Sequence, residues 1–203
     1  MKKLLFLCAG LLCLGACASV PVGSCGENLA RPYFFEQGEK IAAFRMLLSA
    51  GEQNIEGILQ IKKTADEKYE VTIFSTAGAY RLLQATLTRD GAQYSFLIPA
   101  IDRSAVRIKA ERFLSLLLFP SQTRGSCKIK ADKWQVNYKH APMTYLYETD
   151  QTYPAELIGP KSLGRVYLTF TDYQPYESGQ LPHKLHYRDG KIRVDLTLLR
   201  LKK

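Results

Sequence analysis

The sequence predicts a mainly β protein of the α+β class, built as a strongly curved antiparallel sheet or incomplete β-barrel with a helical lid. Apolar and polar residues alternate with period two over much of residues 40–98 and 133–201, as in strands with one buried face. Short turn sequences, including Asp90-Gly91 and Asp189-Gly190, separate these runs. Only residues 102–119 change to helical spacing. About ten antiparallel strands and one main helix are most simply arranged as a curved sheet or open barrel.

The first residues are typical of a bacterial export signal. Two lysines precede an uncharged apolar run at 4–14, and Gly15 and Ala16 close it. The run is shorter than the roughly 20 residues that a transmembrane helix needs. Leu14-Gly15-Ala16-Cys17 resembles the lipobox of bacterial lipoproteins, which implies cleavage before Cys17 and acylation of its thiol and new amine. The alternative is an ordinary cleaved signal followed by a chance cysteine.

We therefore expect a signal peptide at 1–16, a lipid anchor and tether at 17–30, and one domain at 31–203. The tether is rich in Gly, Pro and Ser. Several acyl chains on Cys17 hold a protein on a bilayer, whereas one chain binds only marginally. Residue 18 is Ala rather than Asp, which, by the sorting rule known for enteric lipoproteins, implies an outer-membrane protein facing the periplasm.

The remaining cysteines suggest a disulfide. Cys8 and Cys13 leave with the signal peptide, so Cys25 and Cys127 remain in a compartment that permits disulfides. We hypothesise that Cys25 and Cys127 pair and fix the tether to the domain. The alternative is two unpaired thiols.

The composition favours a membrane surface over nucleic acid as partner. The formal net charge is +9 and 46% of the residues are hydrophobic. A basic protein at a lipid surface is attracted to anionic headgroups. The basic residues are spread along the chain without a Lys/Arg block, and an exported lipoprotein does not meet nucleic acid.

Ten strands are expected along the chain. Five precede the helix, at 40–50, 56–63, 69–75, 79–88 and 92–100, and five follow it, at 133–139, 143–149, 164–173, 181–188 and 191–201. Their alternation places Tyr69, Val71 and Ile73 on one face. It also places Trp134, Val136 and Tyr138 together on one face, and it directs Val166, Leu168 and Phe170 inward.

The helical stretch 102–119 has an apolar and a basic side. Val106, Ala110, Phe113, Leu114 and Leu117 recur at helical spacing, and Arg103, Arg107, Lys109 and Arg112 lie opposite. Asp102 or Ser104 can cap its start, and Pro120 ends it. Three interpretations stay open: a solvated basic face, a lid whose basic side meets phosphates, or a strand at 104–110 followed by a shorter helix.

No motif indicates catalysis, a metal or a cofactor. His183 and His186 are three apart on an expected strand, so they point to opposite faces. The chain has no Cys-x-x-Cys pair, H-E-x-x-H, Gly-rich phosphate loop or G-x-S-x-G elbow. Asp172 and Asp195, expected on neighbouring strands, are interpreted as solvated or salt-bridged. We therefore predict a protein that is not an enzyme.

Aromatic and apolar residues suggest a lipophilic site. The chain has 12 tyrosines and 9 phenylalanines, and a curved sheet under a helix encloses a concave apolar space. The alternative is that these residues fill a packed core. The candidate ligand-binding residues are Phe44, Leu59, Ile61, Val71, Ile73, Leu82, Phe96, Phe113, Leu117, Val136, Leu168 and Phe170.

The order of these features resembles the LolB family of outer-membrane lipoprotein receptors and related lipoproteins of the LolA/LolB-like superfamily. The lipobox, tether, five-strand meander and helix precede W-x-V-x-Y at 134–138 and L-P-x-x-L…D-G-x-I-x-V-x-L at 181–198, and the meander match covers 57–88. The resemblance implies an incomplete barrel whose hydrophobic cavity accepts acyl chains delivered by a LolA-like carrier protein.

Two departures favour a LolB-like relative over LolB itself. Ala77, in the loop Ser75-Thr76-Ala77-Gly78, replaces an exposed leucine of the family, and the segment between Tyr138 and Leu181 is longer by about one hairpin. We therefore expect a membrane-anchored protein that binds lipid or acylated cargo, with a structural or assembly lipoprotein with a filled core as the alternative.

Overall fold

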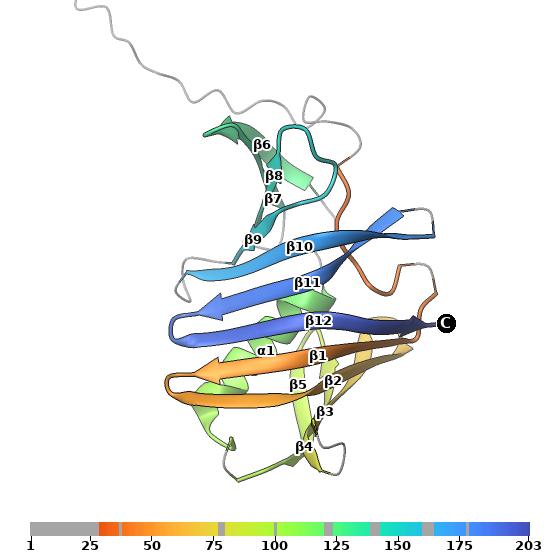
Figure 1. The fold of residues 1–203 in the computed structure, drawn as a ribbon, viewed down its shortest axis with the longest axis vertical. Helices are drawn as coiled ribbons and strands as arrows, with labels where there is room; N and C mark the ends of the chain where they lie inside the picture. Colours follow the sequence, from red (N-terminus) through yellow and green to blue (C-terminus); the bar gives the residue numbers. More distant parts are fainter. Residues whose placement is uncertain are drawn as a thin grey trace, which may run out of the picture.

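The computed structural model describes residues 29–36, 38–76, 80–99, 101–119, 124–138, 143–159, 165–177 and 179–203, so the signal peptide, Cys17, most of the tether and Ala77 lie outside it. The described residues form one sheet of twelve strands and one helix (Figure 1). The strands are β1 (Ile41–Ala50), β2 (Gln53–Ala65), β3 (Lys68–Ser75), β4 (Arg81–Thr88), β5 (Gly91–Leu97), β6 (Arg124–Lys130), β7 (Lys133–Tyr138), β8 (Thr144–Glu148), β9 (Glu156–Ile158), β10 (Val166–Tyr176), β11 (Gly179–Asp189) and β12 (Ile192–Lys202), and the helix is α1 (Ser104–Leu118).

The sheet is a continuous meander joined at its middle by β1 and β12. Its order is β5-β4-β3-β2-β1-β12-β11-β10-β9-β8-β7-β6, and every neighbouring pair is antiparallel. The edge strands β5 and β6 do not pair, so the sheet is curved but unclosed. Because α1 connects these two edges, it crosses behind β1, β11 and β12 in Figure 1 and covers the inner face. The predicted fold class is confirmed.

The inner face carries the residues that alternation predicted. Tyr69 and Val71 of β3 are buried, as are Val136 of β7 and Val166 and Leu168 of β10. Large side chains fill the part of the sheet away from α1. The chain before β1 contributes to this packing, since Phe34 and Phe35 are buried and the Tyr147 hydroxyl donates to the carbonyl of Ala30 at 3.1 Å.

The helix begins without the cap that the sequence suggested. Its N-cap residue is Arg103, with no side-chain capping bond, and Asp102 instead accepts a hydrogen bond from Arg107 Nε at 2.8 Å. The capping role expected of Asp102 or Ser104 is therefore wrong. The strand alternative at 104–110 is also wrong, because these residues are helical. Phe113, Leu114 and Leu117 are buried against the sheet, as their spacing predicted.

Two strands were not expected. β6 follows a stretch that reads as a loop, and its turn to β7 uses Ala131 and Asp132, both with positive φ (49° and 59°), where Asn-Gly is the usual signal. β9 has only three residues and lies just after Pro154. A strand of three residues is too short for alternation to be recognised. Among the described residues no helix is both long and apolar enough to cross a bilayer.

Candidate functional site

An apolar cavity lies between the N-terminal half of α1 and the inner face of the sheet. Its volume is about 250 Å³. It is lined by Met46, Leu48, Ala50, Gln53, Ile55, Leu59, Ile73, Leu83, Ile101, Arg103, Val106, Lys109, Ala110, Phe113, Leu114, Tyr187, Ile192 and Val194. Most of the wall is aliphatic or aromatic. A cavity of this lining accepts hydrocarbon and offers little to a polar ligand.

The cavity opens at the end of the molecule where α1 begins. Met46, Leu59 and Leu114 are buried at its inner end, whereas Ala50 and Arg103 are exposed at its rim. Ala50 lies four positions after Met46 on β1, so the cavity is about 13 Å deep along that strand. Its volume is somewhat below the roughly 300–1,000 Å³ of pockets for drug-sized ligands. The shape fits one short chain or the end of a longer one.

Three of the candidate ligand-binding residues line this cavity: Leu59, Ile73 and Phe113. Seven others are buried in the core but do not line it. They are Phe44, Ile61, Val71, Leu117, Val136, Leu168 and Phe170. Their inward orientation agrees with the alternation, but α1 covers only part of the sheet, so the remainder packs against itself. Their role in binding stays a prediction.

Leu82 and Phe96 were assigned to the wrong face. Leu83 of β4 is buried and lines the cavity, so its neighbour Leu82 points to the outer face. Phe96 is 42% exposed and pairs with Gln84 on that outer face. A β-bulge between Gln84 and Ala85 shifts the register with β5, and a shift of one residue moves side chains across the sheet. The alternation of residues 83, 85 and 87 was the available signal for the correct face.

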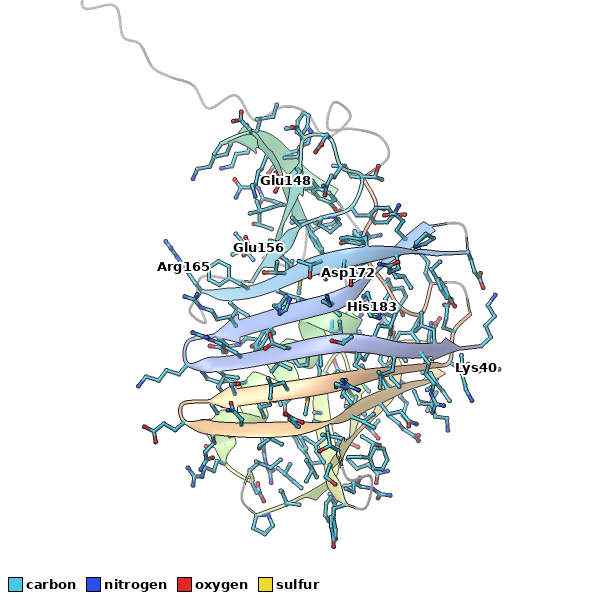
Figure 2. The ribbon with its side chains drawn as sticks, in the orientation of Figure 1. Lys40, Glu148, Glu156, Arg165, Asp172 and His183 are labelled. Atoms are coloured by element: carbon cyan, nitrogen blue, oxygen red, sulfur yellow. The ribbon has the colours of Figure 1, made fainter. Side chains whose placement is uncertain are left out.

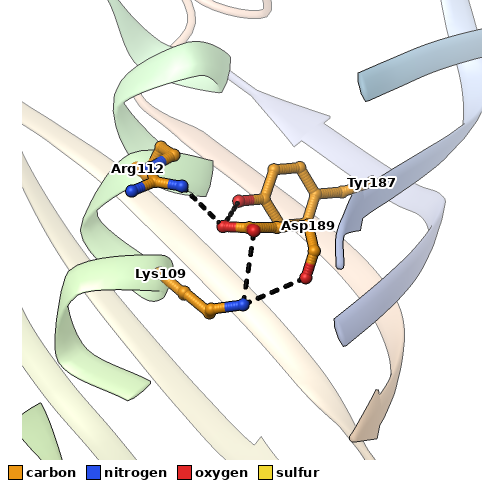
Figure 3. Close-up of polar contacts among 4 residues, drawn as sticks. All are labelled: Lys109, Arg112, Tyr187 and Asp189. Atoms are coloured by element: carbon orange, nitrogen blue, oxygen red, sulfur yellow. Dashed lines mark hydrogen bonds and ion pairs between the residues drawn. The ribbon is translucent and has the colours of Figure 1, made fainter. Parts of the chain in front are cut away.

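A buried carboxylate fixes α1 to the β11–β12 turn (Figure 3). Arg112 Nη1 donates to Asp189 Oδ2 at 2.8 Å, and Lys109 Nζ contacts Oδ1 at 3.3 Å and the Asp189 carbonyl at 3.1 Å. The Tyr187 hydroxyl donates to Oδ2 at 3.3 Å. The side chains of Asp189 and Arg112 are 9% and 14% exposed. Burial, and then the Asp189 charge, raise the pKa of Tyr187, so this hydroxyl stays a donor.

The other flank of α1 is held by the edge strand β5. The Tyr94 hydroxyl donates to the Arg107 carbonyl at 3.3 Å, and the Arg107 guanidinium lies 5.2 Å from the centre of the Tyr94 ring. Burial, and then nearby Glu111, raise the pKa of Tyr94 to about 12. Contacts with Tyr94 and Asp189 therefore attach the helix to both halves of the sheet, as a lid over the cavity.

The basic side of α1 is thus divided between two roles. Lys109 and Arg112 contact Asp189 and Arg107 contacts Asp102, whereas Arg103 is exposed at the cavity rim. The expectation of a wholly solvated basic face is wrong for Arg112. The interpretation that the basic side of α1 meets phosphates stays a prediction.

The outer-face carboxylates are engaged with histidines, as expected for salt-bridged groups. Asp172 lies beside His183 and Lys184 (3.3 and 3.4 Å, Figure 2), and His186 Nδ1 lies 2.8 Å from Asp195. β11 separates the two aspartates, so the expectation of neighbouring strands is wrong. A hydrogen bond from Gln174 and then contacts with His183 and Lys184 lower the pKa of Asp172. No group of three potential metal ligands occurs within the described part of the chain.

A larger cleft of about 1,070 Å³ lies beyond the other end of α1, beside Leu118 and Phe119. Charged pairs line it, including Arg89–Glu67 at 2.6 Å and Lys63–Asp66 at 3.6 Å. Such walls bind water well and hydrocarbon poorly. The smaller cavity is therefore the better site for a lipophilic ligand.

Cys127 is buried on β6 and is disulfide-bonded. All other cysteines of the chain, including Cys25, lie outside the described residues. Pairing of Cys127 with Cys25 specifically stays a prediction.

Comparison with known proteins identifies the fold. No family model and no curated protein sequence match the chain. A LolA superfamily protein from Nitrosomonas europaea has a similar structure, with a TM-score of 0.52 and 10% identity over 83% of this chain and 87% of that one. A domain assigned to outer membrane lipoprotein sorting, from Vibrio parahaemolyticus, gives a TM-score of 0.44 and 9% identity over 81% and 85%. A curved, unclosed antiparallel sheet whose inner face is covered by a helix is thus a fold that this chain shares with a LolA superfamily protein.

Proposed function

We propose that this chain is a non-enzymatic lipoprotein of the bacterial envelope that binds acyl chains, or another lipophilic cargo, in the cavity under α1. The observation that carries the proposal is the apolar cavity of about 250 Å³, open at the start of the helix. Because most of its wall is hydrocarbon, binding would be driven by apolar burial, at about 0.8 kcal/mol per CH₂. Eight buried methylenes would then contribute roughly 6 kcal/mol before the costs of ordering.

The lining indicates what part of the cargo is recognised. Deep in the cavity, Met46, Leu59, Leu83 and Leu114 offer no hydrogen bond to a headgroup. Gln53 and Arg103 lie at the rim, and the polar ends of Lys109 and Tyr187 are bound to Asp189. We infer that the cargo inserts its chain and leaves its polar end outside. An acylated protein or a lipid would meet this requirement.

The cellular setting of the proposal comes from the sequence. The lipobox resemblance supports acylation of Cys17 and attachment to the outer membrane, facing the periplasm. The resemblance to LolB-like lipoproteins supports delivery of cargo by a soluble LolA-like carrier protein. In this scheme the anchored chain receives the acyl chain and passes it to the bilayer.

The first experiment is native mass spectrometry of the full chain carrying Cys17→Ser, before and after incubation with palmitate or a palmitoylated peptide. We expect one bound acyl species. Ala110→Leu, which projects an isobutyl group into the cavity, should weaken binding at least about tenfold, since it displaces several buried methylenes of cargo. The matched control is Ala105→Leu on the same helix, because Ala105 is exposed and does not line the cavity.

A chain that stays free of ligand under all conditions would contradict the proposal. It would favour the structural or assembly role, in which the protein acts through a partner. Equal binding by both alanine variants would instead place the ligand outside this cavity.

A further inference from the structure

Five cations without ion-pair partners lie at the end of the molecule where the cavity opens. We refer to Arg103, Arg165, Arg188, Lys191 and Arg193 as the basic end. Within the described ranges, none of the five forms a salt bridge. All five are exposed. Figure 2 shows Arg165 beside the start of β10, at the opposite end of the sheet from Lys40.

Two of these arginines face each other directly. Arg188 of β11 pairs with Arg193 of β12, so both side chains project from the same outer face. Two acids, Glu156 and Asp195, line the same outer-face pocket as these arginines, and Asp195 already contacts His186. Like charges directly opposite each other destabilise a sheet. An anion placed between the two guanidinium groups would remove that repulsion.

The remaining members surround the same end from other sides. Lys191 lies in the β11–β12 turn, and its neighbour Ile192 lines the cavity. Arg103 lies at the cavity rim on the inner face. The basic end therefore extends over both faces of the sheet and includes the mouth of the cavity.

The opposite end of the molecule also carries cations. Four lysines or arginines there form ion pairs with acids, namely Lys62–Glu70, Lys63–Asp66, Arg89–Glu67 and Lys203–Glu177. Lys68, Arg200 and Lys202 form no salt bridge within the part of the chain that the structure describes. Cations without ion-pair partners therefore occur at both ends, but only those of the basic end surround the mouth of the apolar cavity.

We propose that the basic end docks on an anionic bilayer surface, with the cavity mouth toward the headgroups. Mobile lipid phosphates can approach cations on a turn and on both faces of a sheet, whereas one rigid protein interface would reach only some of them. Docking of this kind orients the cavity for exchange of an acyl chain with the membrane. The proposal goes beyond cargo binding and requires neither cargo nor the lipid anchor.

The test measures sedimentation with vesicles of phosphatidylcholine alone or mixed with phosphatidylglycerol, using the full chain with Cys17→Ser. The variant Arg188→Gln/Lys191→Gln/Arg193→Gln should bind the anionic vesicles on the order of 100-fold more weakly, since each such residue near an anionic surface contributes roughly fivefold. The control Lys68→Gln/Arg200→Gln/Lys202→Gln removes the same charge from exposed sites at the other end. It should change binding less than about fivefold.

Three outcomes would overturn the proposal. Equal weakening by both triple variants would mean that only net charge matters. Equal binding to the two kinds of vesicle would exclude an electrostatic surface. Unchanged binding by the basic-end variant would place the membrane contact elsewhere on the chain, such as the N-terminal segment, which all samples share. Cargo binding is scored separately with Ala110→Leu, so failure of one proposal does not imply failure of the other.

Discussion

The contact between α1 and the β11–β12 turn gives the sharpest stability prediction. Asp189→Asn keeps the shape of the side chain and removes its charge. Arg112 and Lys109 would then lie, 14% and 30% exposed, beside a neutral amide. The variant therefore tests whether the buried carboxylate holds the helical lid on the sheet.

The expected loss follows from the distances and the exposure. Opposite charges 2.8 Å apart, as for Arg112 and Asp189, attract by about 6 kcal/mol at an effective dielectric constant near 20. Desolvation of both groups offsets much of this, and removing one partner of a buried pair costs about 3–5 kcal/mol. Because Lys109 is partly solvated, we expect a loss at or just below the lower limit of this range, about 2–3 kcal/mol.

Urea unfolding followed by tryptophan fluorescence measures this loss, since Trp134 of β7 is the only tryptophan. With a slope of about 2 kcal/mol/M, the midpoint should fall by about 1–1.5 M. The control is Asp195→Asn, whose half-exposed carboxylate contacts a single basic side chain, His186, and it should cost less than about 1 kcal/mol. A shift for Asp189→Asn no larger than that of the control would refute the reasoning.

Three further predictions address other parts of the chain. Gly57→Ala should destabilise the protein by about 1–3 kcal/mol, because a Cβ there would meet the Phe74 carbonyl oxygen at 2.4 Å; an unchanged melting temperature would contradict this. Burial raises the pKa of Glu156, so the stability from its protonated form is lost as the pH rises through that pKa. Glu156→Gln should then raise the free energy of unfolding in urea at pH 7 by at most about 0.5 kcal/mol, and it should have no effect below about pH 4. A non-reduced tryptic digest should contain one peptide linking Cys25 to Cys127, and finding Cys127 joined to another cysteine would show that our pairing is wrong.

The alternation of apolar residues was enough to predict the architecture. Strands with a strict period of two, such as residues 69–73 and 166–170, have their expected faces inward because one buried face fixes the register. The two Asp-Gly hairpins and the helix also occur where predicted. Prediction failed where the signal is local and weak, at the three-residue β9, at the Ala131-Asp132 turn, and at the bulge that reverses Phe96.

The sequence by itself determined a mainly antiparallel sheet, one amphipathic helix, and the absence of recognised catalytic motifs. Only the tertiary structure decided which inward residues face empty space. Leu59 and Val71 have the same inward pattern, yet only Leu59 lies under the N-terminal half of α1 and lines the cavity. Likewise, nothing local distinguishes Asp189 from any other turn aspartate until the helix places Arg112 against it. Both outcomes depend on where α1, which connects the two edge strands, crosses the concave face of the sheet. Periodicity along one strand carries no information about that crossing.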